Sequence, residues 1–506
     1  MQENDETPAA IEDIIQSIDD EETLYVIYGF EFDIKGRTRP DALIYTGEFE
    51  TGELLHGQAE LEKYIIDKTQ ILINQRVLKD NASISAAVGA RLEDGSFPVI
   101  ITIKVEDSWN IIALPRPYYK NDVGFDLTIK ARDYNFLGTM NPLRVDLGYT
   151  YDTERHHSFL LGVFSSMPFT ALGYHWNVTF NNTFSYRPQV EEPFYYQNVS
   201  GLSMELPFRA TTFTFGFEEA FNLNEENPDR YKENYGEFQS GLYMASRIYT
   251  SWKIPTGYYV SRYGELTYNP EIWATFNHEM PGMPLEEIRR GPFLGFNHSL
   301  GFEKVDWHLN YRDGISLFLE NSYSYDFYRL QNDKDPLSIS FALNASGYFI
   351  ISDFFGISSR LRYRHWFYHD PDYYDQASDS MRGIVDKAIT ANYMLSLNMD
   401  FPFRVLLFTP SEWFNSRRLS FFDFELHISP VVDMALYHDP RTGTSFNPKN
   451  IAASGGLEFI VFPSFMRNFI VRLGFAVNLR ELLTVRPFSL PDGDNREFYF
   501  IMGHFY

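Results

Sequence analysis

The chain has 506 residues and a net charge of −25 at pH 7, which argues against a nucleic-acid partner because a polyanion would repel it. The chain contains 0 cysteines, which excludes a disulfide scaffold and zinc bound by thiol ligands. Its 46 Phe and 34 Tyr come with a mean hydropathy of −0.29 and no apolar run of about 18 residues that could span as a helix. This combination favours either a transmembrane β-barrel or a large array of soluble β-sandwiches.

Residues 1–22 form an acidic N-terminal segment. Ile11, Ile14 and Ile18 recur at the spacing of an amphipathic helix, so we predict a linker that contains a short helix. The segment has no apolar core of the kind that a secretory signal needs. A transmembrane β-barrel must be exported, so for that fold class we expect the native precursor to carry a signal peptide that this chain lacks.

Residues 23–108 are predicted to form one small α+β domain. An alternating strand over 25–35 precedes two helices, over 41–55 and 58–78, and a hairpin follows over 81–107. The expected order of elements is therefore β-α-α-β-β.

Residues 109–506 follow a period of 2 that no helical period interrupts. In the stretch PLRVDLGYTYD, apolar side chains take one face while Arg144 and Asp146 take the other. Short connections alternate with long polar ones, and the length fits about 16 strands. The predicted fold class is therefore mainly β: a C-terminal transmembrane antiparallel β-barrel behind the small α+β domain. We expect its last strand, 497–506, to close against its first, near 123–132, because lipid tolerates no open sheet edge.

Several segments, in order along the chain, resemble the Omp85 superfamily. RDYNFLGTMNPLRVDLGYTYD resembles the first barrel hairpin, YRDGISLFLE a mid-barrel strand, DSMRGIVDK the long sixth loop and FYFIMGHFY the closing strand. Residues 24–107 resemble one POTRA domain in element order. The resemblance implies a periplasmic POTRA domain, an outer-membrane barrel and a loop, about 369–391, that folds into the lumen. The main assembly factor of the family carries several POTRA domains, and this chain departs from it with one.

The resemblance assigns Arg382 and Gly383 to a latch on that loop, with Asp400 and Asp433 as its lumen partners. The period-2 pattern of the two strands independently turns both carboxylates toward the lumen. A guanidinium can bind carboxylates in a bidentate manner. Spacing alone equally allows both acids to be ordinary polar lumen residues.

The resemblance also implies a weak lateral seam between the first and last strands, and a C-terminal assembly signal. The residues assigned to these features are Gly124, Phe125, Phe498, Phe500, Gly503 and Tyr506. The two glycines are compatible with weak pairing, because glycine weakens a strand.

The sequence shows no catalytic constellation, phosphate loop or metal-binding motif, so we expect no enzyme activity, no cofactor and no metal site. The leading hypothesis is an outer-membrane biogenesis factor that captures unfolded clients by strand addition to its POTRA domain and inserts them. Expected partners are unfolded outer-membrane or secreted proteins, outer-membrane lipids, accessory lipoproteins and periplasmic chaperones. One alternative is a dedicated two-partner-type secretion pore for one exported protein, with the N-terminal helix as a plug. Another is a passive porin-like or structural surface barrel.

Overall fold

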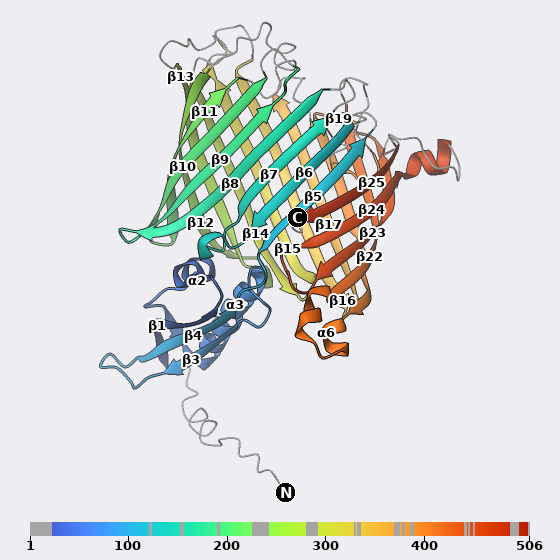
Figure 1. Cartoon of the computed structure of the whole chain (residues 1–506). Helices are drawn as coiled ribbons and strands as arrows, with labels where there is room; N and C mark the ends of the chain where they lie inside the picture. The colour runs from blue at the N-terminus through green and yellow to red at the C-terminus, as the bar shows by residue number, and fades with distance from the viewer. Residues whose placement is uncertain are drawn as a thin grey trace. The chain divides into compact units, whose positions relative to one another are not determined.

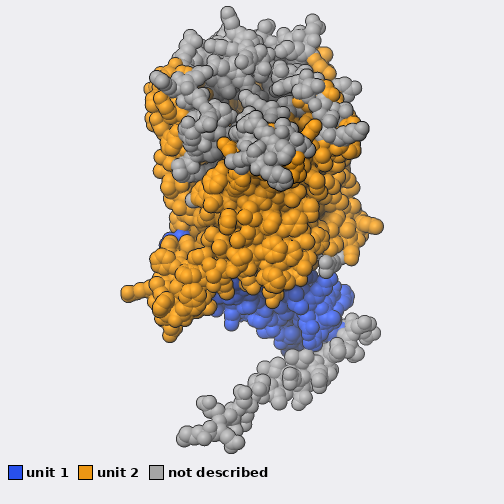
Figure 2. Space-filling view, turned by 90° about the vertical axis from the view of Figure 1, so that its right-hand side faces the viewer, with its two compact units in different colours: residues 1–109, 137–140 blue, residues 110–136, 141–506 orange. Residues whose placement is uncertain are grey.

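The computed structural model divides into two compact units, which Figure 2 colours separately. Unit 1 comprises residues 1–109 and 137–140, and unit 2 comprises residues 110–136 and 141–506. The structure describes residues 23–120, 124–151, 156–189, 193–224, 242–279, 292–327, 330, 335–368, 375–376, 380–384, 389–439, 443, 446–448, 451–485 and 495–503. The acidic segment 1–22, Tyr506 and much of the predicted lumen loop lie outside these ranges.

Unit 1 consists, in its described part, of a four-stranded sheet and two helices (blue in Figure 1). Its elements are β1 (Leu24–Lys35), α2 (Pro40–Gly47), β2 (Leu54–His56), α3 (Gly57–Asn74), β3 (Ser83–Val88) and β4 (Phe97–Glu106). The strand order is β2-β1-β4-β3, with β1 and β4 parallel and the other pairs antiparallel. Alternate residues of the central strands pack on the helices, and the centre of this core is fully buried at Ile27, Leu43, Leu72, Ile101 and Ile103.

The first helix of unit 1 is shorter than the predicted 41–55. It ends at Gly47 because Glu48 adopts a left-handed conformation with φ of 49°, which stops a helix. Gly52, with φ of 84°, then turns the chain into the edge strand β2. The observed order is therefore β-α-β-α-β-β, while the predicted hairpin is present as β3 and β4.

Unit 2 is a closed antiparallel barrel (Figure 1), and the predicted fold class is confirmed. Within the described residues the barrel sheet contains 19 labelled strands, two of which are parts of one strand, so 18 strands go around the barrel where about 16 were expected. The labelled strands are β5 (Ile111–Lys120), β6 (Gly124–Asp133), β7 (Leu143–Tyr151), β8 (His157–Ala171), β9 (Tyr174–Tyr186), β10 (Phe194–Phe208), β11 (Thr211–Leu223), β12 (Leu242–Tyr259), β13 (Glu265–Glu279), β14 (Pro292–His308), β15 (Tyr311–Asp326), β16 (Leu337–Ser352), β17 (Phe355–Tyr368), β20 (Tyr393–Asp400), β21 (Phe403–Phe408), β22 (Phe424–His438), β23 (Ala452–Pro463), β24 (Ile470–Asn478) and β25 (Arg496–Gly503). β20 and β21 are consecutive parts of one interrupted strand, since both pair with β17 and with β22.

Smaller elements lie in the connections. They are η1 (Phe136–Gly138), η2 (Ser261–Tyr263), the paired strands β18 (Asp375–Gln376) and β19 (Thr390–Ala391), α6 (Pro410–Trp413), η6 (Arg417–Phe422) and η8 (Glu481–Val485). In the part of the chain that the structure describes, no helix is both long enough and apolar enough to cross a membrane.

The two ends of the barrel differ in the length of their connections. At the end where β5 begins, four connections have two residues each, at 172–173, 209–210, 309–310 and 353–354. At the opposite end, residues 224–241 join β11 to β12 and residues 280–291 join β13 to β14. Outer-membrane barrels have this asymmetry, with the short turns on the periplasmic side.

The barrel closes at a different strand from the one predicted. The neighbour of β25 is β5, whereas Gly124 and Phe125 lie on β6, between β5 and β7. The predicted seam at 123–132 is therefore wrong by one strand. Pro115 and Pro117 hid β5 in the sequence, because proline cannot donate to a ladder and usually marks the absence of a strand.

Three of the other residues predicted for the seam, Phe498, Phe500 and Gly503, lie on the closing strand, and Tyr506 lies outside the described residues. Phe498 and Phe500 are on β25, which ends at Gly503. They are paired with Phe475 and Leu473 of β24. Phe498 is exposed, with 67% of its surface accessible.

Candidate functional site

The described part of the predicted lumen loop contains a buried ion-pair network centred on Arg382. The guanidinium binds Asp433 of β22 in a bidentate manner, from Nε to Oδ2 at 2.9 Å and from Nη2 to Oδ1 at 2.6 Å. The backbone N–H of Arg382 also donates to Asp433 Oδ2, at 2.8 Å. Only 1% of the Asp433 side chain is exposed, so this carboxylate depends on Arg382 for its charge compensation.

Two more carboxylates complete the coordination of Arg382. Its Nη1 donates to Asp400 Oδ1 of β20 at 2.6 Å and to Glu458 Oε1 of β23 at 3.0 Å. Glu458 is 1% exposed and also accepts bonds from Arg472 Nη1, at 3.2 Å, and from the Tyr499 hydroxyl, at 2.6 Å. The network thus contains three carboxylates and two guanidiniums, from four barrel strands and the loop. Charged, hydrogen-bonded partners on every side are what lets such groups stay buried.

Gly383 joins the loop to the closing strand. Its backbone N–H donates to Glu497 Oε2 of β25 at 2.9 Å. Its φ is 78°, and a Cβ at this position would lie 2.6 Å from Val477 N and 2.7 Å from the carbonyl carbon of Ala476. Only glycine satisfies both the left-handed conformation and this close approach to β24.

Apolar residues seal the network on one side. Met381 and Ile384, which flank the Arg-Gly pair, are both 4% exposed and belong to a buried cluster. The other members of the cluster are Ile389, Ala391, Met394 and Ala435. Removing water from around Arg382 strengthens its electrostatic attraction to the carboxylates.

The structure therefore brings together four of the residues predicted for the site: Arg382, Gly383, Asp400 and Asp433. Sequence reasoning missed Glu458, Arg472, Glu497 and Tyr499. Each of these lies on a strand whose pattern alternates, and an acidic residue such as Glu458 within GGLEFIV was the available signal. Which distant strand it would face could not be read from local spacing.

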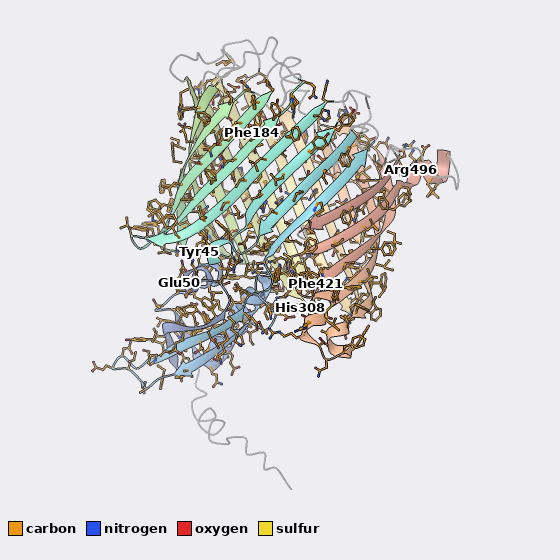
Figure 3. All side chains as sticks on the ribbon, in the orientation of Figure 1. Tyr45, Glu50, Phe184, His308, Phe421 and Arg496 are labelled. Carbon is orange, nitrogen blue, oxygen red and sulfur yellow. The ribbon has the colours of Figure 1, made fainter. Side chains whose placement is uncertain are left out.

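The outward face of the barrel is apolar. Large exposed side chains on this face include Leu161, Phe180, Phe217, Ile248, Ile272, Phe349 and Phe475. Figure 3 shows Phe184 toward the end with the long connections and Phe421 at the short-turn end. An apolar band with aromatic residues toward both ends suits a barrel embedded in lipid.

Comparison with solved structures finds CdiB and BamA proteins. CdiB from Acinetobacter baumannii is 11% identical with a TM-score of 0.47, over 95% of this chain and 74% of that chain. BamA from Haemophilus ducreyi lacking POTRA domains 1–3 is 12% identical with a TM-score of 0.40, over 95% of this chain and 85% of that chain. CdiB from Escherichia coli is 10% identical with a TM-score of 0.46, over 94% of this chain and 76% of that chain. No model of a protein family and no curated protein matches the chain.

The chain consists of a small α+β unit and a closed antiparallel barrel. Unit 2 is a closed antiparallel barrel, and unit 1 is a small α+β unit that precedes it in the sequence. One α+β unit ahead of a closed antiparallel barrel is the architecture that the sequence resemblance to the Omp85 superfamily predicts, and this chain has it.

Proposed function

We propose that the protein is an outer-membrane biogenesis factor. In this proposal the barrel lies in the outer membrane, unit 1 lies in the periplasm, and the short turns face that side. Unit 1 binds an unfolded client, and the barrel inserts it into the membrane through the β5–β25 seam. The observation that carries the proposal is the network that fastens the Arg382 loop to the closing strand, since a passive pore has no need to tie an inner loop to its seam.

Strand β3 offers unit 1 an edge for client binding. It is the last strand in the described sheet, and its sequence SISAAV has no charge and no proline, the devices that usually protect an edge. The bond from Gly89 N to Pro98 O continues the β3–β4 register, so odd-numbered residues face β4. The N–H and C=O groups of Ile84, Ala86 and Val88 therefore point away from the sheet, where an extended client can pair with them.

The prolines of β5 support a weak seam. The bond from Tyr134 N to Asn110 O continues the β5–β6 register, so even-numbered residues of β5 pair with β6 and odd-numbered ones face β25. Pro115 and Pro117 are both odd-numbered, so two neighbouring positions on the seam side have no N–H to donate. In this account the prolines, rather than Gly124, weaken the seam.

Reconstitution tests client capture. The purified full chain is placed in liposomes, a urea-unfolded barrel protein is added, and the folded client is measured by its heat-modifiable gel mobility. We expect Ala86→Pro to lower insertion several-fold because it removes an outward N–H while leaving the β3–β4 ladder bonds in place. Ala86→Val keeps the N–H and serves as the matched control. Equal insertion by both variants, with equal thermal unfolding, would exclude strand addition at β3.

A further inference from the structure

The register of the strands shows which side chains of each barrel strand point into the lumen, starting from the Arg382 latch. Asp400 faces the lumen, where it binds Arg382, and side chains on neighbouring strands that share a register pair share a face. The registers carry this assignment from β20 through β17, β16, β15 and β14 to Trp273 on β13 and Tyr249 on β12. Their neighbours in sequence, Ile272 and Ile248, therefore face outward, as does Phe217, the partner of Ile248. All three are about half exposed, as lipid-facing residues are.

Polar side chains interrupt this outward face on β9 and β10. Asn182 accepts hydrogen bonds from the Tyr196 hydroxyl at 2.8 Å and from Asn198 Nδ2 at 2.9 Å. Ser200 Oγ donates to Asn198 Oδ1 at 3.0 Å. These residues share a face with Leu202, which is outward and exposed. An alternating strand does not need polar residues here for its fold.

The polar row continues onto β11, β12 and β13. Glu219, directly opposite Ser200 in the register, accepts a hydrogen bond from Ser246. His278 Nε2 lies 3.2 Å from Glu219 Oε1 and 3.0 Å from Ser246 Oγ. We call the whole set the outer polar row: Asn182, Tyr196, Asn198, Ser200, Glu219, Ser246 and His278. Glu219 and His278 lie close to the long-connection ends of β11 and β13, where the outward face of a barrel approaches the membrane interface, so this carboxylate is placed to meet a lipid headgroup.

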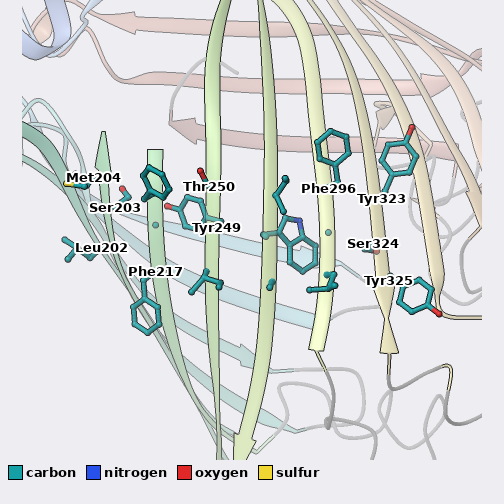
Figure 4. A pocket seen from close by; sticks show the side chains of 18 of the residues that line it. Leu202, Ser203, Met204, Phe217, Tyr249, Thr250, Phe296, Tyr323, Ser324 and Tyr325 are labelled. Carbon is teal, nitrogen blue, oxygen red and sulfur yellow. The ribbon is translucent and has the colours of Figure 1, made fainter. Parts of the chain in front are cut away.

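An apolar groove of about 810 Å³ lies next to the outer polar row. Figure 4 shows Leu202, Phe217, Thr250 and Phe296 among the side chains that line it. Leu202, Phe217 and Ile248 each stand two residues along the strand from a member of the row, so the groove and the row share one face. The small side chain of Ala274, between Ile248 and Leu294 in the register, leaves space in the groove.

We propose that this face is a binding site for one membrane lipid, whose acyl chains fill the groove and whose headgroup bonds to the outer polar row. The Glu219 carboxylate can only accept hydrogen bonds, so the part of the headgroup that reaches it must donate through hydroxyl or ammonium groups. A headgroup that is only a phosphate diester is excluded, because Glu219 would repel it. Aminophospholipids and glycolipids share the required chemistry. The strands of the site, β9 to β16, are separated from the β5–β25 seam by several strands on either side.

Lipid binding by the purified full chain tests the proposal. Native mass spectrometry in detergent would measure retention of added phosphatidylethanolamine, of a rough-type lipopolysaccharide and of phosphatidylmethanol, an anionic phosphodiester lipid whose headgroup has no hydroxyl or ammonium donor. We expect Glu219→Ala to weaken the preferred lipid roughly tenfold, the loss of one charge-assisted hydrogen bond. Glu218→Ala is the matched control, since Glu218 is the next residue but faces the lumen and pairs with Arg247. Retention of the ethanolamine lipid or of the glycolipid identifies the source of the headgroup.

A second pair of variants tests the groove and guards against misfolding. Ala274→Trp fills the groove and should lower retention of every bound lipid, whereas Ala345→Trp, on the outward face of β16 but outside the groove, should not. Heat-modifiable mobility identifies folded variants. The proposal is overturned if folded Glu219→Ala and Ala274→Trp retain lipid as well as their controls. It is also overturned if the wild-type chain retains phosphatidylmethanol best or retains no lipid.

Discussion

At the scale of single residues, Asp433 is the main hydrogen-bonding partner of Arg382. Asp433→Ala leaves the guanidinium without its bidentate partner while Glu458 and Asp400 remain, and breaking a buried pair in this way costs about 3 kcal/mol. We expect a lower unfolding midpoint for the full chain in detergent. Glu303→Ala, at an exposed position on β14, is the control and should leave the midpoint unchanged. Equal midpoints for both variants would mean that the Asp433 pair contributes nothing to stability.

Gly383 is predicted to be intolerant of any side chain. Gly383→Ala combines a positive φ with a Cβ that would meet the backbone of β24, so we expect a loss of about 2 kcal/mol or more and release of the loop. Gly173 has the same φ of 78° with nothing within 4 Å of its Cβ position, so Gly173→Ala carries the conformational cost alone. Limited proteolysis of the loop should separate the two variants. Equal cleavage of the loop in the two variants would contradict the close packing of Gly383 against β24.

Sequence reasoning reached part of this site. Period 2 was enough to turn Asp400 and Asp433 inward, and the resemblance added Arg382 and Gly383. Glu458 and Glu497 could not be assigned, because their partnership with the loop depends on strand register across the barrel, which no local pattern encodes. The barrel strands place the carboxylates on the lumen side, and the loop brings Arg382 between them.

At the scale of elements, β5 explains both an error of the sequence reasoning and a property of the seam. Its prolines look like strand breakers, yet their missing N–H groups face the closing strand, where proline is tolerated. The opposite error occurred at 41–55, where apolar periodicity suggested one long helix and the left-handed Glu48 ended it early. Both errors come from backbone constraints that outweigh side-chain pattern.

Replacing the two prolines of β5, which restores backbone N–H donors at the seam, should impair the insertion of clients. In the double variant Pro115→Val and Pro117→Val, two N–H groups become available to β25, so we expect slower hydrogen exchange in both strands and less client inserted into liposomes. Pro270→Val, on β13 and away from the seam, is the control. Seam amides that become protected while insertion stays at the wild-type level would exclude opening at β5–β25.

For the whole molecule, composition left a barrel and soluble β-sandwiches open, and period-2 alternation with short and long connections in turn then favoured the barrel, which leaves no open sheet edge in lipid. The expected count of about 16 strands differs from the observed 18 because β5 was missed and because the division of the chain into strands depends on turns that alternation does not mark. The proposed client could not be predicted, because recognition through a backbone edge would carry no sequence signature.

The most direct test of the proposed function is to deplete this protein in its own organism and quantify every outer-membrane component. A biogenesis factor predicts a fall in many unrelated barrel proteins while inner-membrane proteins stay constant. Loss of one secreted or surface protein, with the other barrels intact, would contradict that account and identify a dedicated secretion pore. An unchanged outer membrane with lower permeability to small solutes would contradict it too and identify a passive pore.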